Sequence, residues 1–206
     1  MIIFRILDII PQNLTDGRWQ LIFRFLLSFS SRKFSAFDIF IYLCTMFKNT
    51  DYLEDEIYGQ RLLISTHADL RELNSNIRAA RAILHSFPDV FIIINAHTFE
   101  LGHSNPEYTI DSRLGDRKGI MSEKGVTAGF KSAKKQGCKI VVIDLDEHIW
   151  KVRPFELSKY IARRKADFVK GMMEACYIVF NGEAVVVNAN EQTRREIEFV
   201  INELKP

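Results

Sequence analysis

The chain has 206 residues, of which 47% are hydrophobic, so it is long enough to bury a core without disulfides or a bound metal. Its formal net charge of +2 is close to neutral and indicates no polyanionic partner by itself. Cys44, Cys138 and Cys176 are scattered in apolar segments without a Cys-x-x-Cys pair. This pattern argues against a disulfide framework or a zinc site and indicates a reducing compartment, which we expect to be the cytoplasm.

The first sixty residues predict a helical region without catalytic spacing. Apolar residues recur at helical intervals in two stretches, Trp19–Phe29 and Phe37–Phe47. Both stretches are too short to span a bilayer, and nothing before them has the pattern of a secretory signal. Residues 51–60 are acidic and predict a connector. We therefore expect a helical N-terminal region at 1–60 and a second domain at 61–206.

From residue 61 onward, periodicity predicts alternating helices and strands. Helices are expected at 70–87, at 125–137, from Pro154 through Met172, and at 197–204; strands are expected at 90–94, 107–111, 116–121, 139–145, 176–180 and 184–188. Turns at Ser112–Gly115 and at Asn181-Gly182 would close two hairpins. Tight hairpins among helices predict an α+β fold, with one twisted, mostly antiparallel sheet packed by helices, rather than a doubly wound sheet.

Polar and ionisable residues crowd one stretch of this second domain. They are His97, Glu100, His103, Asn105, Glu107, Asp111, Arg113, Asp116, Arg117 and Lys118. Because successive strand side chains point to opposite faces, Asp116 and Lys118 should share one face and Arg117 should lie on the other. Beside a strand bearing Glu107 and Asp111, such a pair can cut phosphodiester bonds. Carboxylates can hold Mg²⁺, which activates water, while a lysine stabilises the developing charge.

Pro106-Glu107, followed after eight residues by Asp116-Arg117-Lys118, resembles the P-(D/E)…(D/E)-x-K signature of the restriction-endonuclease-like nucleases. The helix and strand expected before this string, and those expected after it, also resemble the core of that family. The resemblance implies a Mg²⁺-dependent nuclease in which Glu107 and Asp116 bind the metal and Lys118 assists.

A second resemblance covers roughly residues 88–190. It is carried by Asn105-Pro106-Glu107-Tyr108-Thr109-Ile110-Asp111, Gly115-Asp116-Arg117-Lys118, Ala133-Lys134-Lys135-Gln136-Gly137 and Ile140-Val141-Val142-Ile143-Asp144-Leu145. These strings are similar to the C-terminal tRNA-nuclease domains of CdiA-type contact-dependent inhibition toxins, with relatives on phage and other mobile-element toxins. Glu107 stands where that pattern has Asp, Ser112 stands where it has Gly, and the turn differs by one or two residues. The resemblance implies a ribonuclease toxin of the barnase/EndoU/colicin/RelE group, acting on tRNA and neutralised by an immunity protein.

A ribonuclease needs no metal cofactor, because the RNA 2′-hydroxyl is the nucleophile. It needs a general base, a general acid and cations on the phosphate. His97 and His103 are the acid–base candidates, since an unperturbed imidazole titrates near pH ~6.5, and Glu107, Asp111 and Asp116 complete the catalytic set. Lys118 and Arg113 would stabilise the phosphorane. The residues expected to bind the RNA backbone are Arg113, Arg117, Lys131, Lys134 and Lys135.

Three hypotheses follow. The preferred one is a metal-independent endoribonuclease toxin, and the first alternative is the Mg²⁺-dependent nuclease. The second alternative is a non-catalytic adaptor whose Phe-rich N-terminus recruits a partner, with Asp116 and Lys118 only a surface ion pair. The acidic segment 144–148 could bind a cation or could simply be a solvated strand exit. Cleavage that survives EDTA would separate the first hypothesis from the second.

Overall fold

The computed structural model describes residues 51–98, 104–122, 124–147, 154–188 and 193–204. They belong to a unit that begins at Thr50. The helices expected at 19–29 and 37–47 lie outside the described residues. None of the helices that the structure describes is both long and apolar enough to cross a membrane.

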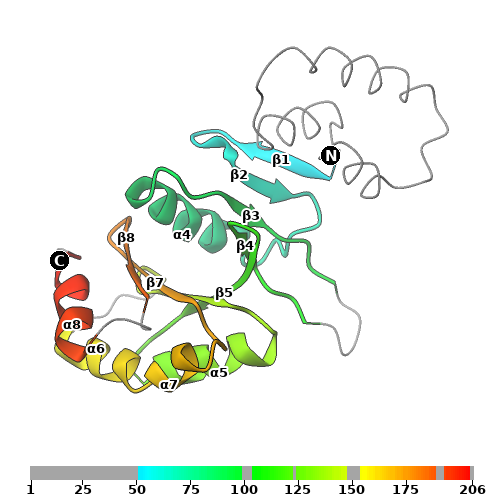
Figure 1. Ribbon diagram of the computed structural model, residues 1–206. Coiled ribbons are helices and arrows are strands. Elements are labelled where there is room, and N and C mark those ends of the chain that lie inside the picture. Colours follow the sequence, from blue (N-terminus) through cyan, green and yellow to red (C-terminus); the bar gives the residue numbers. More distant parts are fainter. Residues whose placement is uncertain (1–50, 99–103, 123, 148–153, 189–192, 205–206) are drawn as a thin grey trace, which may run out of the picture. The chain divides into compact units, whose positions relative to one another are not determined.

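Eight strands form one mixed sheet whose spatial order follows the chain (Figure 1). They are β1 (Tyr52–Asp55), β2 (Gly59–Ser65), β3 (Ile92–Ile94), β4 (Tyr108–Ile110), β5 (Arg113–Gly119), β6 (Ile140–Asp144), β7 (Ala175–Phe180) and β8 (Glu183–Val187). The pairs β1–β2, β3–β4, β4–β5 and β7–β8 are antiparallel, and the pairs β2–β3, β5–β6 and β6–β7 are parallel. The expected α+β class with a single sheet is confirmed.

The helices make the crossovers that parallel pairs require. The helix α4 (Leu73–Ser86) joins β2 to β3, and α5 (Gly125–Lys135) joins β5 to β6. Between β6 and β7 lie α6 (Pro154–Ala162) and α7 (Lys165–Val169), and α8 (Arg194–Asn202) follows β8. One strand shows how the layers form. Ile140 and Val142 of β6 pack in the cluster with α4, whereas Val141 and Ile143 pack with the later helices. The sheet is therefore covered by α4 on one face and by α5 to α8 on the other.

The hairpin of β4 and β5 turns earlier than the expected turn at Ser112–Gly115. Asp111 and Ser112 are the two turn residues, with φ of 45° and 68°. Two consecutive residues with positive φ match the twist of the flanking strands, and Asp tolerates this conformation. Gly115 therefore lies inside β5, opposite Tyr108. This register places Glu107, which precedes Tyr108, beside Asp116.

Two further expectations were wrong. The acidic connector predicted at 51–60 forms β1 and the start of β2, at the edge of the sheet. The single helix predicted from Pro154 through Met172 is divided into α6 and α7 around Arg163 and Arg164. The Asn181-Gly182 turn is confirmed, with φ of 52° and 75°, and so is the stripe of α5, in which Val126, Phe130 and Ala133 are buried.

Candidate active site

Three predicted site residues converge on the face of the sheet that α5 covers. The ammonium Nζ of Lys118 lies 3.1 Å from Oδ1 of Asp116 and 3.5 Å from Oε1 of Glu107. The second oxygen of Glu107, Oε2, accepts a hydrogen bond of 3.1 Å from the backbone N–H of Arg117. The predicted alternation along β5 is therefore confirmed for Asp116 and Lys118, and the hairpin register brings Glu107 to the same point. We call these three residues the carboxylate–lysine cluster.

Close packing of α5 places the cluster at an interface between helix and sheet. A Cβ atom at Gly129 of α5 would meet Ile143 Cδ1 at 3.3 Å and Lys118 Cγ at 3.4 Å. The missing side chain thus lets the helix backbone approach the lysine stem. Asp116 is fully buried, while Lys118 and Glu107 keep 29% and 17% of their side-chain surface exposed. Solvent therefore reaches the cluster from the side of Lys118 and Glu107.

The two carboxylates of the cluster share one ammonium group, that of Lys118. Both side-chain oxygens of Asp116 are buried, and the Lys118 Nζ atom lies 3.1 Å from Oδ1 without the geometry of a hydrogen bond. Burial, followed by the proximity of Asp116, raises the pKa of Glu107 from 4.5 to about 8, although Lys118 opposes this. Two adjacent carboxyl groups resist double ionisation unless a cation compensates them. This pair therefore favours the protonated form of Glu107 over ionisation of both carboxyl groups.

Lys118 keeps its proton in this setting. Burial acts to lower its pKa, but the negative charges of Glu107 and Asp116 outweigh burial, so the net pKa is raised. An ammonium group fixed between two carboxylates can stabilise negative charge on a nearby phosphate.

No group of three or more His, Cys, Asp or Glu side chains within the described ranges is arranged to hold a metal ion. A divalent cation at the cluster would thus have two protein carboxylates and would take its other ligands from water and substrate. Mg²⁺ is commonly bound in this way, by one or two carboxylates together with substrate phosphates and waters.

Arg117 lies on the opposite face of the sheet and is buried there, with 3% of its surface exposed. Its Nη1 donates to Asp144 at 2.9 Å and to Glu147 at 2.7 Å, and its Nε donates to the side-chain oxygen of Asn76 at 2.6 Å. Arg78 of α4 donates to the same oxygen of Asp144 at 2.7 Å. The expectation that Arg117 contacts the substrate backbone is therefore wrong, because its guanidinium ties β5 to α4 and β6.

A small hollow of about 50 Å³ lies beside Glu107 and is also lined by Glu72, Asn76 and His97. The Nδ1 atom of His97 is 4.0 Å from Asp69 Oδ2, and the imidazole is one-quarter exposed. Of the two histidines expected to act as acid and base, His97 thus borders the same hollow as one cluster carboxylate. His103 lies outside the described residues.

The other predicted residues are spread over the surface. Asp111 sits in the β4–β5 turn, where its Oδ1 accepts from the backbone N–H of Phe91 at 3.0 Å, so it is remote from Glu107 along the hairpin. Arg113, next to this turn, pairs with Glu174 at 3.4 Å. Lys134 is held by Asp167 at 2.7 Å. Lys131 and Lys135 are exposed on α5.

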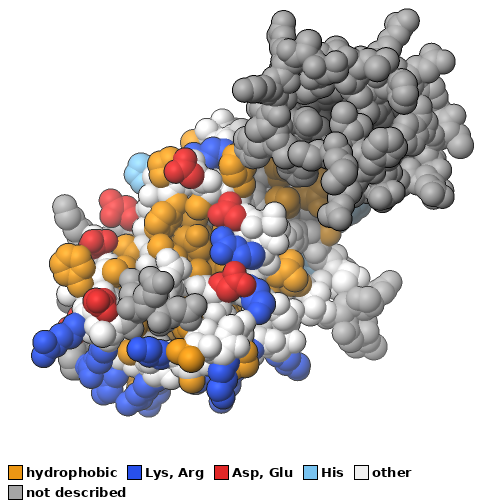
Figure 2. All heavy atoms as spheres, viewed as in Figure 1, with side chains coloured by type: hydrophobic (Ala, Val, Ile, Leu, Met, Phe, Trp, Pro, Cys, Tyr) orange, Lys and Arg blue, Asp and Glu red, His pale blue; other side chains and the backbone are white. Residues whose placement is uncertain are grey.

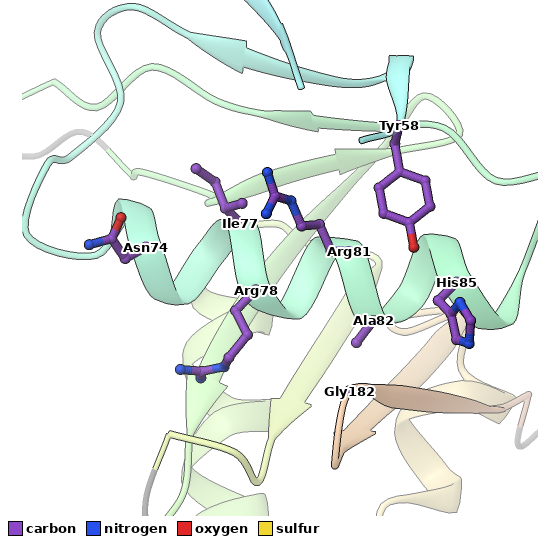
Figure 3. Close-up of a pocket in the computed structure, with 8 residues that line it drawn as sticks. All are labelled: Tyr58, Asn74, Ile77, Arg78, Arg81, Ala82, His85 and Gly182. Atoms are coloured by element: carbon purple, nitrogen blue, oxygen red, sulfur yellow. The ribbon is translucent and has the colours of Figure 1, made fainter. Parts of the chain in front are cut away.

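A larger open hollow of about 520 Å³ lies along the side of α4 (Figure 3). Tyr58, Arg81 and His85 border it, and the turn at Gly182 closes one side. Arg81 pairs with Asp55 at 2.7 Å, and Arg78 is occupied by Asp144. Both arginines are thus engaged by acids that hold the fold together.

Sequence reasoning missed Asn76 as a partner of Arg117, and it interpreted Asp144 and Glu147 as part of a cation site or a solvated strand exit, whereas Asp144 is fully buried and both acids pair with Arg117. Gly119 belongs with them, because a Cβ atom there would fall 1.5 Å from the Glu147 carboxylate.

Cys138 is a buried free cysteine. Burial, and then the charges of Asp116 and Glu107, raise the pKa of Cys138 to about 12, so its thiol stays neutral.

Comparison with known proteins assigns no family to this arrangement: no protein-family model matches the chain, and neither a curated protein nor a solved structure matches it significantly.

Proposed function

We propose that the chain is a nuclease and that the carboxylate–lysine cluster of Glu107, Asp116 and Lys118 is its reaction centre. The observation that carries this proposal is the convergence of two carboxylates and an ammonium group within 3.5 Å on one sheet face. The order α4, β3, β4, β5, α5, β6 around the hairpin also supports it, since it supplies the flanking helices and strands that the restriction-endonuclease-like resemblance implies. This geometry favours the metal-dependent alternative over metal-independent chemistry.

Glu107 and Asp116 fit a divalent cation such as Mg²⁺. Burial and then the proximity of Asp116 raise the pKa of Glu107, and both carboxylates share the ammonium group of Lys118, so a divalent cation would favour the ionised form of both. When bound there, Mg²⁺ would supply an activated water and would neutralise phosphate charge.

The chain's own groups then have separate tasks. Lys118 presents a protonated Nζ atom toward the phosphate and stabilises the charge that develops during cleavage. Glu107 faces the small hollow and can exchange a proton with water near its raised pKa. Asp116 is fully buried, and its Oδ1 atom positions the Nζ atom of Lys118 at a distance of 3.1 Å. Arg117 acts from the opposite face by holding β5 against α4.

A metal-independent ribonuclease is the second candidate, favoured by the position of His97 on the same hollow as Glu107. In this mechanism His97 would be the general base or acid for attack by the 2′-hydroxyl. We propose tRNA as the substrate to examine first and an immunity protein as a partner, both of which follow from the toxin resemblance.

Cleavage assays on the full chain test both candidates. Purified tRNA and a DNA duplex are incubated with the wild type in Mg²⁺ or in EDTA, and the variants are Asp116→Asn, Lys118→Met and His97→Gln. Asp111→Asn is the matched control, because this carboxyl lies at the far end of the same hairpin. The expected result is Mg²⁺-dependent cleavage that Asp116→Asn abolishes and Lys118→Met slows strongly.

Two other outcomes have a defined meaning. Cleavage of tRNA that persists in EDTA and is lost in His97→Gln would establish the second candidate. If neither nucleic acid is cut in either buffer, the nuclease proposal fails and a binding module becomes the better description.

A further inference from the structure

The positive charge of this chain is concentrated in two segments next to the candidate site. Segments 124–139 and 154–172 contain ten basic residues, namely Lys124, Lys131, Lys134, Lys135, Lys139, Lys159, Arg163, Arg164, Lys165 and Lys170, against the two acids Glu156 and Asp167. The whole chain has a net charge of only +2. The rest of the chain is therefore acidic on balance, and these two segments carry the excess of positive charge.

These two segments fold against each other. Lys134 of α5 pairs with Asp167 of α7 at 2.7 Å, and the rings of Phe130 and Phe168 meet edge to face at 5.7 Å. Figure 2 shows lysine and arginine side chains gathered over the area where Figure 1 places α5, α6 and α7. The charge thus forms one surface.

Five side chains of this surface are exposed and have no acidic partner within hydrogen-bonding distance among the described residues: Lys131, Lys135, Arg163, Lys165 and Lys170. We call them the basic face. Lys134 and Arg164 do not belong to it, because both are held by Asp167. Since Asp167 is buried and already has two cationic partners, it does not neutralise the exposed cations.

Among the described residues, the basic face offers no fully exposed aromatic ring on which the bases of a single strand could stack. Among the described side chains of α5, α6 and α7, Phe130 and Phe168 are buried and Tyr160 is half-buried under Arg163, 5.1 Å from its ring centroid. Proteins that bind single strands use exposed aromatic rings on which bases stack. Cations without such rings instead suit the regular phosphate backbone of a duplex.

On α5, the two basic-face residues and the cluster lie on opposite sides of the helix. Gly129 of α5 faces Lys118 of the cluster, whereas Lys131 and Lys135 face solvent. An α-helix with its side chains is about 10 Å in diameter. Phosphates of one strand succeed one another at about 3.4 Å along a duplex axis, so a few base pairs of backbone are as long as the helix is wide.

We propose that the basic face binds the phosphate backbone of a double-stranded nucleic acid and holds it beside the cluster. The chemistry on this surface is shared by an RNA stem and a DNA duplex. The inference rests on the proposed nuclease function only in that the bound backbone leads to the reaction centre. The binding itself is a separate property of α5, α6 and α7.

Fluorescence anisotropy on the full chain in EDTA measures this binding without cleavage. The probes are an RNA hairpin with a 12-base-pair stem, a DNA duplex of equal length and an unstructured single-stranded RNA, each titrated at several salt concentrations. The variant is Lys131→Glu/Lys135→Glu, and the matched control is Lys131→Arg/Lys135→Arg, which keeps both charges. Because both positions are exposed, thermal unfolding of the variants should match that of the wild type.

We expect at least one duplex to bind more tightly than the single strand. The Glu variant should weaken duplex binding roughly 10-fold to 100-fold and reduce the slope of log K against log salt by about 2, since each lost phosphate contact removes about 0.9. The Arg variant should bind as the wild type does. The duplex that binds more tightly, RNA or DNA, identifies the nucleic acid whose backbone the basic face prefers.

Two results would overturn the proposal. One is unchanged duplex affinity and salt slope in the Glu variant. The other is single-strand binding as tight as duplex binding and equally weakened. Both are distinct from failure of the nuclease proposal, in which the chain binds duplexes as expected but cuts neither nucleic acid when Mg²⁺ is added.

Discussion

Replacing Glu107 by Gln should remove a pH dependence of stability that this carboxyl group creates. Burial and then Asp116 raise the pKa of Glu107 from 4.5 to about 8 in the folded chain, whereas the unfolded chain should titrate near the ordinary value. Between these two values the folded state holds a proton that the unfolded state has released. The free energy of unfolding therefore falls as pH rises through this window.

The size of the effect follows from the pKa. A tenfold change in a protonation equilibrium corresponds to ~1.4 kcal/mol, so Glu107 lowers the free energy of unfolding by at most about 4 kcal/mol between pH ~5 and pH ~8. The Glu107 side chain is 17% exposed. Water near the carboxylate and small rearrangements reduce the cost of ionisation, and we expect a measured loss of about 2 kcal/mol.

Denaturant unfolding in EDTA at several pH values measures this loss. The stability of Glu107→Gln relative to the wild type should rise steadily from pH ~5 to pH ~8, because Gln has no proton to release. Asp111→Asn, in the exposed turn of the same hairpin, should run parallel to the wild type. If the curve of Glu107→Gln is also parallel to that of the wild type, the two carboxyl groups are not coupled and the reasoning about a cation site is refuted.

Three more predictions concern the same region. At pH ~8, Mg²⁺ in excess of its Kd should stabilise the wild type by about 1–3 kcal/mol, visible as a rise of a few degrees in Tm; an equal rise in Asp116→Asn would contradict binding at the cluster. Lys118→Met should lower the cleavage rate about 10²-fold to 10³-fold in a variant that circular dichroism shows to be folded, and full activity in this variant would remove Lys118 from the reaction centre. Arg117→Met should lower the free energy of unfolding by about 3 kcal/mol, because buried Asp144 would lose one of its two cationic partners and keep Arg78; urea denaturation measures this loss, and a stable variant would show that the network is dispensable.

Local periodicity was sufficient to predict much of the fold. The helix α4 was anticipated from apolar residues three and four positions apart, although Leu70, expected in that stripe, precedes the helix and is 80% exposed. The same kind of reasoning placed Asp116 and Lys118 on one face, since alternation in a strand depends only on neighbouring residues. Both features depend only on residues that are close together in the sequence.

The features that sequence reasoning missed depend on residues far apart in the chain or on exposed strands without a regular pattern. The edge strand β1 is mostly exposed and shows no alternation, and its turn is organised by the side chain of Asp55, which accepts from the backbone N–H groups of Ile57 and Tyr58. The partners of Arg117 come from Asn76, 41 residues away, and Asp144, 27 residues away. From the sequence alone, an arginine between an acid and a lysine is interpreted as a substrate contact, because its acidic and amide partners lie far away in the chain.

The turn at Asp111 and Ser112 has a consequence for the reaction centre at the other end of its hairpin. With a two-residue turn, every pairing between β4 and β5 is counted outward from it, up to Glu107 and Asp116. One inserted residue would slide Glu107 by about 3.4 Å and rotate it to the α4 face. The spacing of the reactive groups is thus encoded by two residues that touch none of them, so a chain in which one extra turn residue shifts the strand pairing is expected to have lost the cluster even where all three of its residues are present.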